Sequence, residues 1–339
     1  MVTIKAKYIA ALAATGALAL AGCGASNSGG EGGEGGSGDS KGSDTAAAFT
    51  DCTVGESFAA AEGEGTGEDK DTELTIGAFN GWDESFATAH LLKAVLEEEG
   101  YTVTVEAFEA APAFAGVAAG DIDIITDAWM PVTHPQYIEQ FGDDIEHLGC
   151  WYDNAKLTLA VNEDSPAKSI EDLPEMADEY GGKIYGIEPG AGLTKTTQEK
   201  AIPEYGLEDY EFVVSSTPAM LTQVQKATDS NENVLVTLWR PHWAYSSFPM
   251  RDLEDPKGAM GDAEIISSAA RSGFAEENPR AAQIIKNLAL DDEQLSSLED
   301  NMMNPEKHDG ANHDAAVADW LKENPEFADQ LIAGELNAG

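Results

Sequence analysis

Three tryptophans, Trp82, Trp129 and Trp239, occupy the same kind of position in the sequence. Each stands at or just after the end of an apolar segment typical of a buried strand: ELTIGAF (73–79), DIDIITDAW (121–129) and NVLVTLW (233–239). A single tryptophan at a strand end is more often a core residue. Three at equivalent ends predict a shared cleft, where each indole face can attract a cation by about 2 kcal/mol when water is excluded. A quaternary ammonium suits such a cage because it has no N–H to donate to a carboxylate.

A glycine-rich turn predicts a second kind of contact. The segment EPGAGLT (188–194) lies between a predicted strand, KIYGIE (183–188), and a predicted helix. Glycines let the backbone approach a ligand closely, and the free N–H groups of a helix N-terminus bind anions. The turn has too few glycines, and no Lys-Ser/Thr pair, for a nucleotide P-loop. A carboxylate is the better ligand for it, although a G-x-G segment is often only a turn.

Other polar and aromatic residues near the tryptophans have several interpretations. His242, in LWRPHW, could support Trp239, approach a ligand carboxylate, or have a structural role at the hinge. Trp243 could stand behind the cage. Glu84 is expected to cap the helix that begins near Ser85.

No segment predicts catalysis or metal binding. The segment GDSKG (38–42) matches the G-x-S-x-G pattern of hydrolases, but no strand precedes it, so the strained nucleophile turn cannot form. His308 and His313 form the only close histidine pair, and their spacing does not place them on one helical face. Zinc motifs and cofactor fingerprints are missing from the sequence. We therefore expect a binding protein without catalytic residues, metal or cofactor.

The segments that carry these residues predict an α/β fold with two lobes. Residues 73–129 alternate strand, helix, strand, helix and strand, which favours a parallel sheet with right-handed crossovers. Ligands of such sheets bind beyond the carboxyl ends of the strands, where Trp82 and Trp129 lie. A second α/β unit begins after KLTLAVN (156–162), and residues from about 262 contribute a strand and further helices. We expect a mainly parallel sheet flanked by helices in each lobe, with a hinge between the lobes.

The N-terminus predicts export. Two lysines precede a short apolar stretch that ends in Leu20-Ala21-Gly22-Cys23, which resembles a bacterial lipoprotein box with lipidation at Cys23. An ordinary cleaved signal with a free Cys23 is the alternative. The predicted organisation is a signal peptide (1–22), a Gly/Ser-rich flexible tether (23–70), lobe 1 (71–161), lobe 2 (162–245), and a return to lobe 1 with C-terminal helices (246–339).

The net charge of the chain excludes some classes of ligand. The chain has 62 Asp and Glu against 19 Lys and Arg, a net charge of −43, which argues against nucleic acid and anionic lipid headgroups as ligands. Such acidity is also compatible with a surface adapted to high salt or high pH.

Cys52 and Cys150 would lie in a compartment that permits disulfides, so they could pair or stay free.

Four motifs resemble the substrate-binding proteins of glycine betaine and proline betaine ABC importers: GWDES (81–85), DAWMPVTH (127–134), GGKIYGIEPGAGL (181–193) and LWRPHW (238–243). The resemblance runs from about residue 73 to the C-terminus. It implies a two-lobed periplasmic-binding-protein fold of the type II kind and capture of an osmoprotectant outside the cytoplasm. It also implies a lipid-anchored protein on the outer face of the cytoplasmic membrane that delivers its ligand to a permease and an ATPase. By motif, Trp82, Trp129 and Trp239 would hold the trimethylammonium group, and Gly192, Leu193 and His134 the carboxylate.

Choline binders are a similar sister group. They have an acidic residue shortly after the first tryptophan, where this chain has Glu84. They lack the histidine found here as His134, depart from the Gly-Ala-Gly-Leu turn, and have a tyrosine where this chain has Leu157. Choline also has no carboxylate for the turn to bind. We therefore predict a betaine ligand, with choline or carnitine as the alternative. A ligand sensor and a secreted enzyme acting on a quaternary amine are further alternatives.

Overall fold

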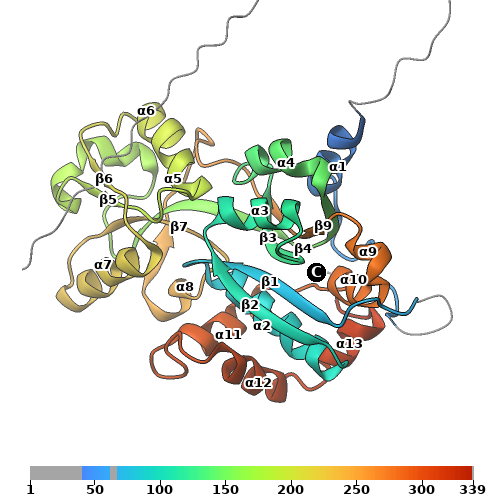
Figure 1. Ribbon diagram of the computed structural model, residues 1–339. Helices are drawn as coiled ribbons and strands as arrows, with labels where there is room; N and C mark the ends of the chain where they lie inside the picture. Colours follow the sequence, from blue (N-terminus) through green and yellow to red (C-terminus); the bar gives the residue numbers. More distant parts are fainter. Residues whose placement is uncertain (1–39, 62–66, 338–339) are drawn as a thin grey trace, which may run out of the picture. The chain divides into compact units, whose positions relative to one another are not determined.

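The computed structural model describes residues 40–61 and 67–337, so the predicted signal peptide, Cys23 and the first part of the predicted tether lie outside it (Figure 1). The strands are β1 (Glu73–Phe79), β2 (Thr102–Phe108), β3 (Ile124–Met130), β4 (Ile145–Asn162), β5 (Lys183–Tyr185), β6 (Glu211–Val213), β7 (Leu235–Arg240), β8 (Met250–Asp252) and β9 (Glu264–Arg271).

Helices precede, connect and follow these strands. They are α1 (Ser40–Thr50), α2 (Asp83–Glu98), α3 (Ala110–Ala119), α4 (Pro135–Phe141), α5 (Gly192–Thr196), α6 (Ile202–Tyr205), α7 (Thr217–Ser230), α8 (Ala244–Ser247), α9 (Phe274–Glu277), α10 (Pro279–Lys286), α11 (Asp292–Met303), α12 (His313–Glu323) and α13 (Phe327–Ala333). Short 3-10 helices lie at Gly142–Asp144, Ile170–Glu175 and Ala177–Tyr180, and a π-helical turn at Thr197–Ala201. Within residues 40–61 and 67–337, every helix is too short or too polar to cross a membrane.

The strands confirm the α/β class and follow the order β2-β1-β3-β9-β4-β7-β5-β6, with β8 paired to β4. In lobe 1, β1 is parallel to β2 and β3, while β9 is antiparallel to β3 and β4. In lobe 2, β5 is parallel to β6 and β7, while β4 is antiparallel to β7 and β8. Each lobe therefore combines the expected parallel core with antiparallel pairs made by the strands that link the lobes.

The strand β4 runs through both lobes. Its residues from Ile145 to Ala155 pair with β9, and those from Lys156 to Val161 pair with β7. The segment KLTLAVN, predicted as the end of lobe 1, therefore has its hydrogen-bond partners in lobe 2. The strand β8, which was not predicted and lies in the segment expected to return to lobe 1, also pairs in lobe 2, with Ala160–Asn162. Sequence periodicity does not show which sheet a strand joins.

Helix α2 positions the residues that follow the first strand. Its apolar face, which includes Leu91, Leu92 and Val95, is fully buried. The helix begins at Asp83 with Trp82 as its N-cap residue, so Glu84 lies inside the first turn and does not cap the helix as predicted. The Ser85 hydroxyl accepts a hydrogen bond from the Phe79 N–H, which fixes the start of the helix to the end of β1.

The folded region begins earlier than the predicted boundary at residue 70. Helix α1 lies within the predicted tether, and its Phe49 is fully buried, as is Ala61. The Gly/Ser-rich composition before this helix masks the short apolar segment AAAF (46–49) in the sequence. At the other end of the chain, α11 and α12 lie along α2 (Figure 1), and α11 has no counterpart among the predicted helices.

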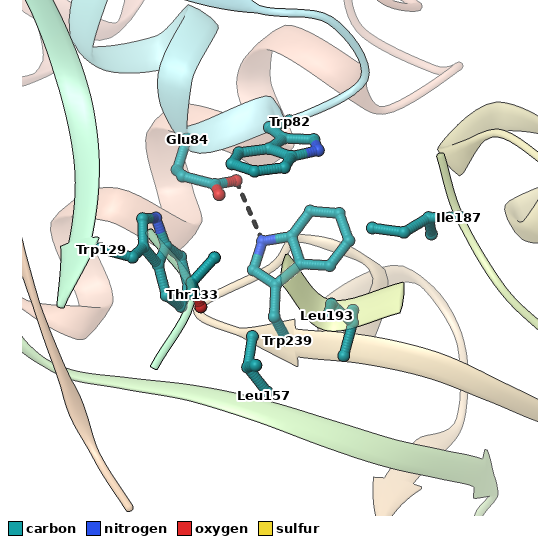
Figure 2. A pocket seen from close by; sticks show the side chains of 8 residues that line it. All are labelled: Trp82, Glu84, Trp129, Thr133, Leu157, Ile187, Leu193 and Trp239. Carbon is teal, nitrogen blue, oxygen red and sulfur yellow. Dashed lines mark hydrogen bonds between the residues drawn. The ribbon is translucent and has the colours of Figure 1, made fainter. Parts of the chain in front are cut away.

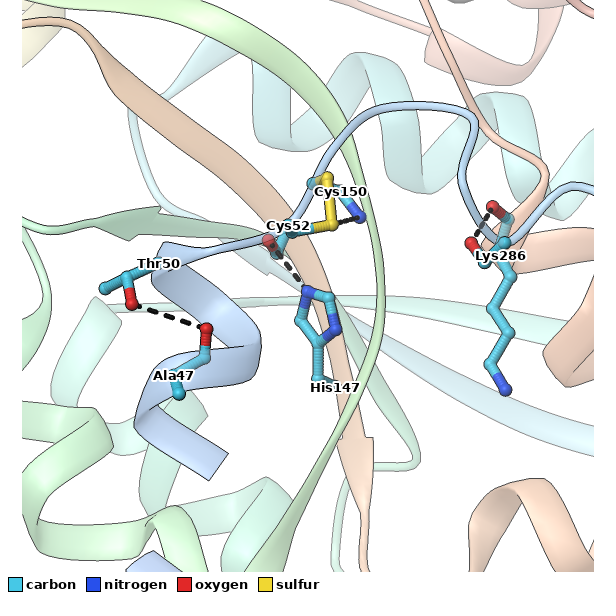
Figure 3. Close-up of a disulfide and its surroundings, with 8 residues drawn as sticks. Ala47, Thr50, Cys52, His147, Cys150 and Lys286 are labelled. Atoms are coloured by element: carbon cyan, nitrogen blue, oxygen red, sulfur yellow. Dashed lines mark hydrogen bonds between the residues drawn. A yellow bond between two sulfur atoms is a disulfide. The ribbon is translucent and has the colours of Figure 1, made fainter. Parts of the chain in front are cut away.

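A disulfide joins the N-terminal segment to β4. Cys52, just after α1, is bonded to Cys150 across a sequence separation of 98 residues (Figure 3). The Cys150 N–H also donates a hydrogen bond of 3.1 Å to the Cys52 sulfur. The segment before β1 is thereby attached to lobe 1.

Candidate ligand-binding site

A small apolar cavity lies between the two lobes, and the three predicted tryptophans line it (Figure 2). Its cavity volume is about 20 Å³, and its walls are Trp82, Glu84, Trp129, Thr133, Leu157, Ile187, Leu193 and Trp239. Lobe 1 contributes the first four of these residues and lobe 2 the others. The convergence follows from topology, because the parallel strands β1 and β3 end at one edge of their sheet.

The three indoles are almost completely enclosed. Trp82 is 7% exposed, Trp129 2% and Trp239 3%. Phe79 packs edge-on against Trp82, with ring centroids 5.2 Å apart. The rings are thus held by the core around them, and their faces border a space from which bulk water is largely excluded.

Buried carboxylates accept the indole N–H groups. Trp129 Nε1 donates to Asp127 Oδ1 at 2.6 Å, and Trp239 Nε1 donates to Glu84 Oε2 at 3.0 Å, as Figure 2 shows for the second pair. Trp243, which does not line the cavity, donates its Nε1–H to Asp83. Because these N–H groups are already bonded, Trp129 and Trp239 present ring faces rather than donors to a ligand.

Burial strongly perturbs these acids. Desolvation, opposed by the Trp243 hydrogen bond, raises the pKa of Asp83 to about 7, and desolvation likewise raises the pKa of Asp127 to about 7. Desolvation and the charges of Asp127 and Glu299 raise the pKa of Glu84 well above its ordinary range. Glu84, predicted as a helix cap and as a possible residue behind the site, forms part of the cavity wall.

His134 lies in the wall behind Trp82 and does not itself line the cavity. Its ring stacks on Trp82, with centroids 5.3 Å apart and planes at 9°. Nδ1 accepts the Trp129 N–H at 3.0 Å, so the neutral ring must carry its proton on Nε2. Burial lowers the pKa of His134 to about 3, which keeps the ring neutral. Nε2 is buried and has no hydrogen-bond partner among the described residues.

His242 resembles His134 in its bonding but lies at a different place. Its Nδ1 accepts the Ala244 N–H at 3.0 Å, and burial lowers its pKa to about 3. Its ring packs edge-on against Trp239, with centroids 4.5 Å apart. Its Nε2 lies 3.7 Å from an Asp83 carboxylate oxygen. His242 thus supports Trp239 from behind, outside the cavity wall.

The glycine-rich turn reaches the cavity through α5. Leu193 lines the cavity, and Gly192 packs against lobe 1 so closely that a Cβ there would lie 2.5 Å from the Thr133 carbonyl oxygen. The Gly192 and Leu193 N–H groups belong to the first turn of α5 and donate no hydrogen bond within the described residues. The turn therefore brings free backbone donors and a glycine-dependent contact to the same edge of the cavity.

Three cavity residues were not among the predicted site residues: Thr133, Leu157 and Ile187. Thr133 is held by Glu264, which accepts its hydroxyl at 2.6 Å and its N–H at 2.8 Å. Thr133 directly precedes His134 in the DAWMPVTH motif, and Ile187 lies near the end of the KIYGIE segment, so position after a strand could have indicated both. Only the comparison with choline binders pointed to Leu157.

The described residues contain no cluster of three or more His, Cys, Asp or Glu side chains suited to a metal ion. The carboxylates near the cavity bond to indoles instead. The chemistry that the site offers is therefore aromatic faces, one carboxylate in the wall, and free backbone N–H groups.

Residues 72–323 match the family described as the substrate binding domain of ABC-type glycine betaine transport system. A curated relative, a glycine betaine/carnitine transport binding protein from Listeria monocytogenes, is 35% identical over 154 residues, or 45% of this chain. The matching region spans 49% of that relative, about half of its length.

Solved structures with similar folds hold two different ligands. A lactococcal protein in its closed conformation with glycine betaine is 28% identical, with a TM-score of 0.71 over 77% of this chain and 100% of that chain. A choline binding protein in complex with choline is 26% identical, with a TM-score of 0.68 over 78% of this chain and 92% of that chain. The two structures are thus almost equally similar to this chain.

Proposed function

Because the chain belongs to the family of substrate-binding domains of ABC-type glycine betaine transport systems, we propose that it captures glycine betaine or a related betaine outside the cytoplasm. Delivery to a permease and an ATPase would make it the binding component of an osmoprotectant importer. Capture needs no bond to be made or broken, so no residue of the cavity is assigned a catalytic role.

The arrangement of the indoles is the observation that carries this proposal. Trp82, Trp129 and Trp239 enclose one cavity from both lobes, and the N–H groups of the last two are bonded to carboxylates. Aromatic faces attract any cation, but a desolvated N–H donor also needs an acceptor, whereas a methylated ammonium is satisfied by the faces alone. Exclusion of water strengthens this attraction because the local dielectric constant falls.

The carboxylate of a betaine would lie toward α5 and His134. The Gly192 and Leu193 N–H groups lie at a helix N-terminus, which favours an anion, and bond to no acceptor in residues 40–61 and 67–337. His134 adds a buried Nε2–H that has no partner among the described residues. A charge-assisted hydrogen bond to such a donor contributes about 1.5–3 kcal/mol. Contact with Nε2 requires the ligand to reach past the residues that line the cavity.

Choline or carnitine is the second candidate, and Glu84 favours it. Its carboxylate is in the cavity wall, where a hydroxyl or a second contact to a cation could reach it. Leu157 opposes this candidate, because an apolar side chain occupies the wall where choline binders have a tyrosine.

Calorimetry with glycine betaine, proline betaine, carnitine, choline and ectoine tests the assignment. We expect the betaines to bind most tightly and ectoine, which lacks a quaternary ammonium, to bind least. Tighter binding of choline than of glycine betaine would overturn the carboxylate assignment of Gly192, Leu193 and His134. Turnover of a bound quaternary amine would overturn the transport proposal itself.

The proposed location depends on residues outside the described chain. We propose that Cys23 is lipidated and that the tether holds the protein on the outer face of the cytoplasmic membrane. In a cell expressing the full chain, Cys23→Ala should release the protein from the membrane fraction. Retention of the variant in that fraction would contradict the anchor.

A further inference from the structure

Four carboxylates are buried together behind the tryptophan cage: Asp83, Glu84, Asp127 and Glu299. They are between 0% and 9% exposed and come from α2, β3 and α11. Only Glu84 lines the cavity (Figure 2). The other three do not line it, and the negative charges within the group of four act on one another.

The hydrogen bonds of this cluster come from neutral donors. Among these donors are three indole N–H groups, the Trp243 backbone N–H, which bonds to Glu299 at 2.8 Å, and the Ser85 side chain, which bonds to Asp127. None of the four carboxylates forms a salt bridge with a lysine or arginine of the described residues. Asp127 Oδ2 and Glu299 Oε1 are buried without a partner there.

The charged groups that the structure describes around the cluster include no compensating cation. His242 is the basic group beside Asp83, and burial keeps it neutral by lowering its pKa to about 3. Glu188, from lobe 2, adds a further negative charge facing Asp83. Several buried carboxylates without a cation cannot all be ionised, so protons must neutralise part of the cluster.

We propose that a quaternary ammonium in the cage takes the place of a proton as the counter-charge of this carboxylate cluster, so that capture of the ligand releases protons to the buffer. The inference rests on the proposed function, because it requires a cation in the cavity. The cation would lie beside Glu84, the one member of the cluster in the wall. Its charge favours the ionised form of every carboxylate nearby.

The sign of the pH dependence follows from the ligand-free state. The pKa of Asp83 and that of Asp127 are raised to about 7, so both groups hold protons at lower pH. A bound cation lowers these pKa values, so affinity should fall as the pH falls below about 7. One proton released per ligand changes the dissociation constant by up to about tenfold per pH unit.

The ligand-free protein should respond to pH in the opposite direction. The folded cluster holds more protons than the unfolded chain between the ordinary carboxyl pKa of about 4 and the raised values. Because of the cluster, the free energy of unfolding should therefore decrease as the pH rises through this window. A ligand should raise the melting temperature more at high pH than at low pH.

Titration calorimetry of the full mature chain tests the proposal. Near about pH 6, the observed binding enthalpy of glycine betaine and of tetramethylammonium should vary linearly with the ionisation enthalpy of the buffer. The sign of the slope should show that protons are released. Binding without this variation, and with equal affinity at about pH 5.5 and about pH 8.5, would overturn the inference but leave the proposed function intact. Failure of every quaternary ammonium to bind would overturn the proposed function.

Amide variants separate charge from position. Glu299→Gln and Asp127→Asn keep a carbonyl oxygen for the Trp243 N–H and the Trp129 indole, but they cannot ionise. Each variant should bind glycine betaine about tenfold more weakly than the wild type at high pH and nearly as tightly as the wild type at low pH. Each should also release fewer protons on binding than the wild type. A loss that is the same at every pH would show a purely structural role.

Glu146→Gln is the matched control. Glu146 is a partly buried carboxylate of β4 that accepts the Ala275 N–H at 3.1 Å, and it is not part of the cavity wall. Its substitution should leave the number of protons released and the pH profile unchanged. If one cluster variant fails to fold, the other still gives the pH profile of binding. A pH profile that Glu146→Gln changes as much as the cluster variants do would contradict the assignment to this cluster.

Discussion

Two segments of the chain place a tryptophan, a cis-proline and a buried histidine at the end of a strand: residues 129–134, after β3, and residues 239–243, after β7. They differ in how their indoles are anchored. Trp129 bonds to Asp127, two residues earlier in its own strand, whereas Trp239 bonds to Glu84 of α2 in the opposite lobe. One ring is therefore oriented locally, and the other depends on the contact between lobes.

The two segments also touch the opposite lobe by different means. In the first segment, Thr133 packs directly on Gly192, with no room for a methyl group. In the second segment, Trp239 and Trp243 donate hydrogen bonds to Glu84 and Asp83. Closure of the cavity thus combines a steric contact, which is sensitive to added volume, with a polar contact, which is sensitive to charge.

The largest expected effect is the loss of either cage ring. Trp129→Ala and Trp239→Ala should each weaken glycine betaine binding by more than about 100-fold, because a buried cation-binding face disappears. Calorimetry measures the loss, and circular dichroism checks that each variant is folded. Replacement by Phe should restore part of the affinity at both positions. Unchanged affinity of one Ala variant would remove that residue from the cage.

A smaller effect is expected from filling the steric contact. Gly192→Ala places a Cβ 2.5 Å from the Thr133 carbonyl oxygen and should weaken binding by about ten- to 100-fold by opposing closure. The matched control is Gly190→Ala in the same turn, where a Cβ would meet no atom within 4 Å. Equal affinities of the two variants would show that the contact between Thr133 and Gly192 does not limit closure.

The two histidines should differ more modestly. His134→Asn retains an acceptor for the Trp129 N–H but removes the unpartnered Nε2–H. The substitution should weaken the binding of glycine betaine by about tenfold and leave the binding of tetramethylammonium nearly unchanged, because only glycine betaine has a carboxylate. An equal loss for both ligands would assign His134 to support of Trp82 instead.

The smallest effect is expected at the second histidine. His242→Asn retains an acceptor for the Ala244 N–H and touches no cavity surface. Affinity for glycine betaine should stay within about twofold of the wild type. A larger and ligand-selective loss would show that the two segments are more alike in function than their contacts indicate.

Local spacing accounts for what the sequence could predict. The strand-end tryptophans converge because parallel strands share an edge, and Asp127 and Trp129 can bond because residues two apart lie on one face of a strand. The pairing of Trp239 with Glu84 joins residues 155 positions apart and depends on how the lobes meet. The pairing of KLTLAVN with β7 was hidden for the same reason.

The crossing strand β4 has a consequence for motion. Its pairing with β9 is interrupted between Tyr152 and Ala155, next to the point where it joins β7, and Asp153 and Asn154 are exposed there. Such an irregularity bends and twists a strand where few ladder bonds resist. Rotation of one lobe against the other would therefore bend β4 most easily at these two residues.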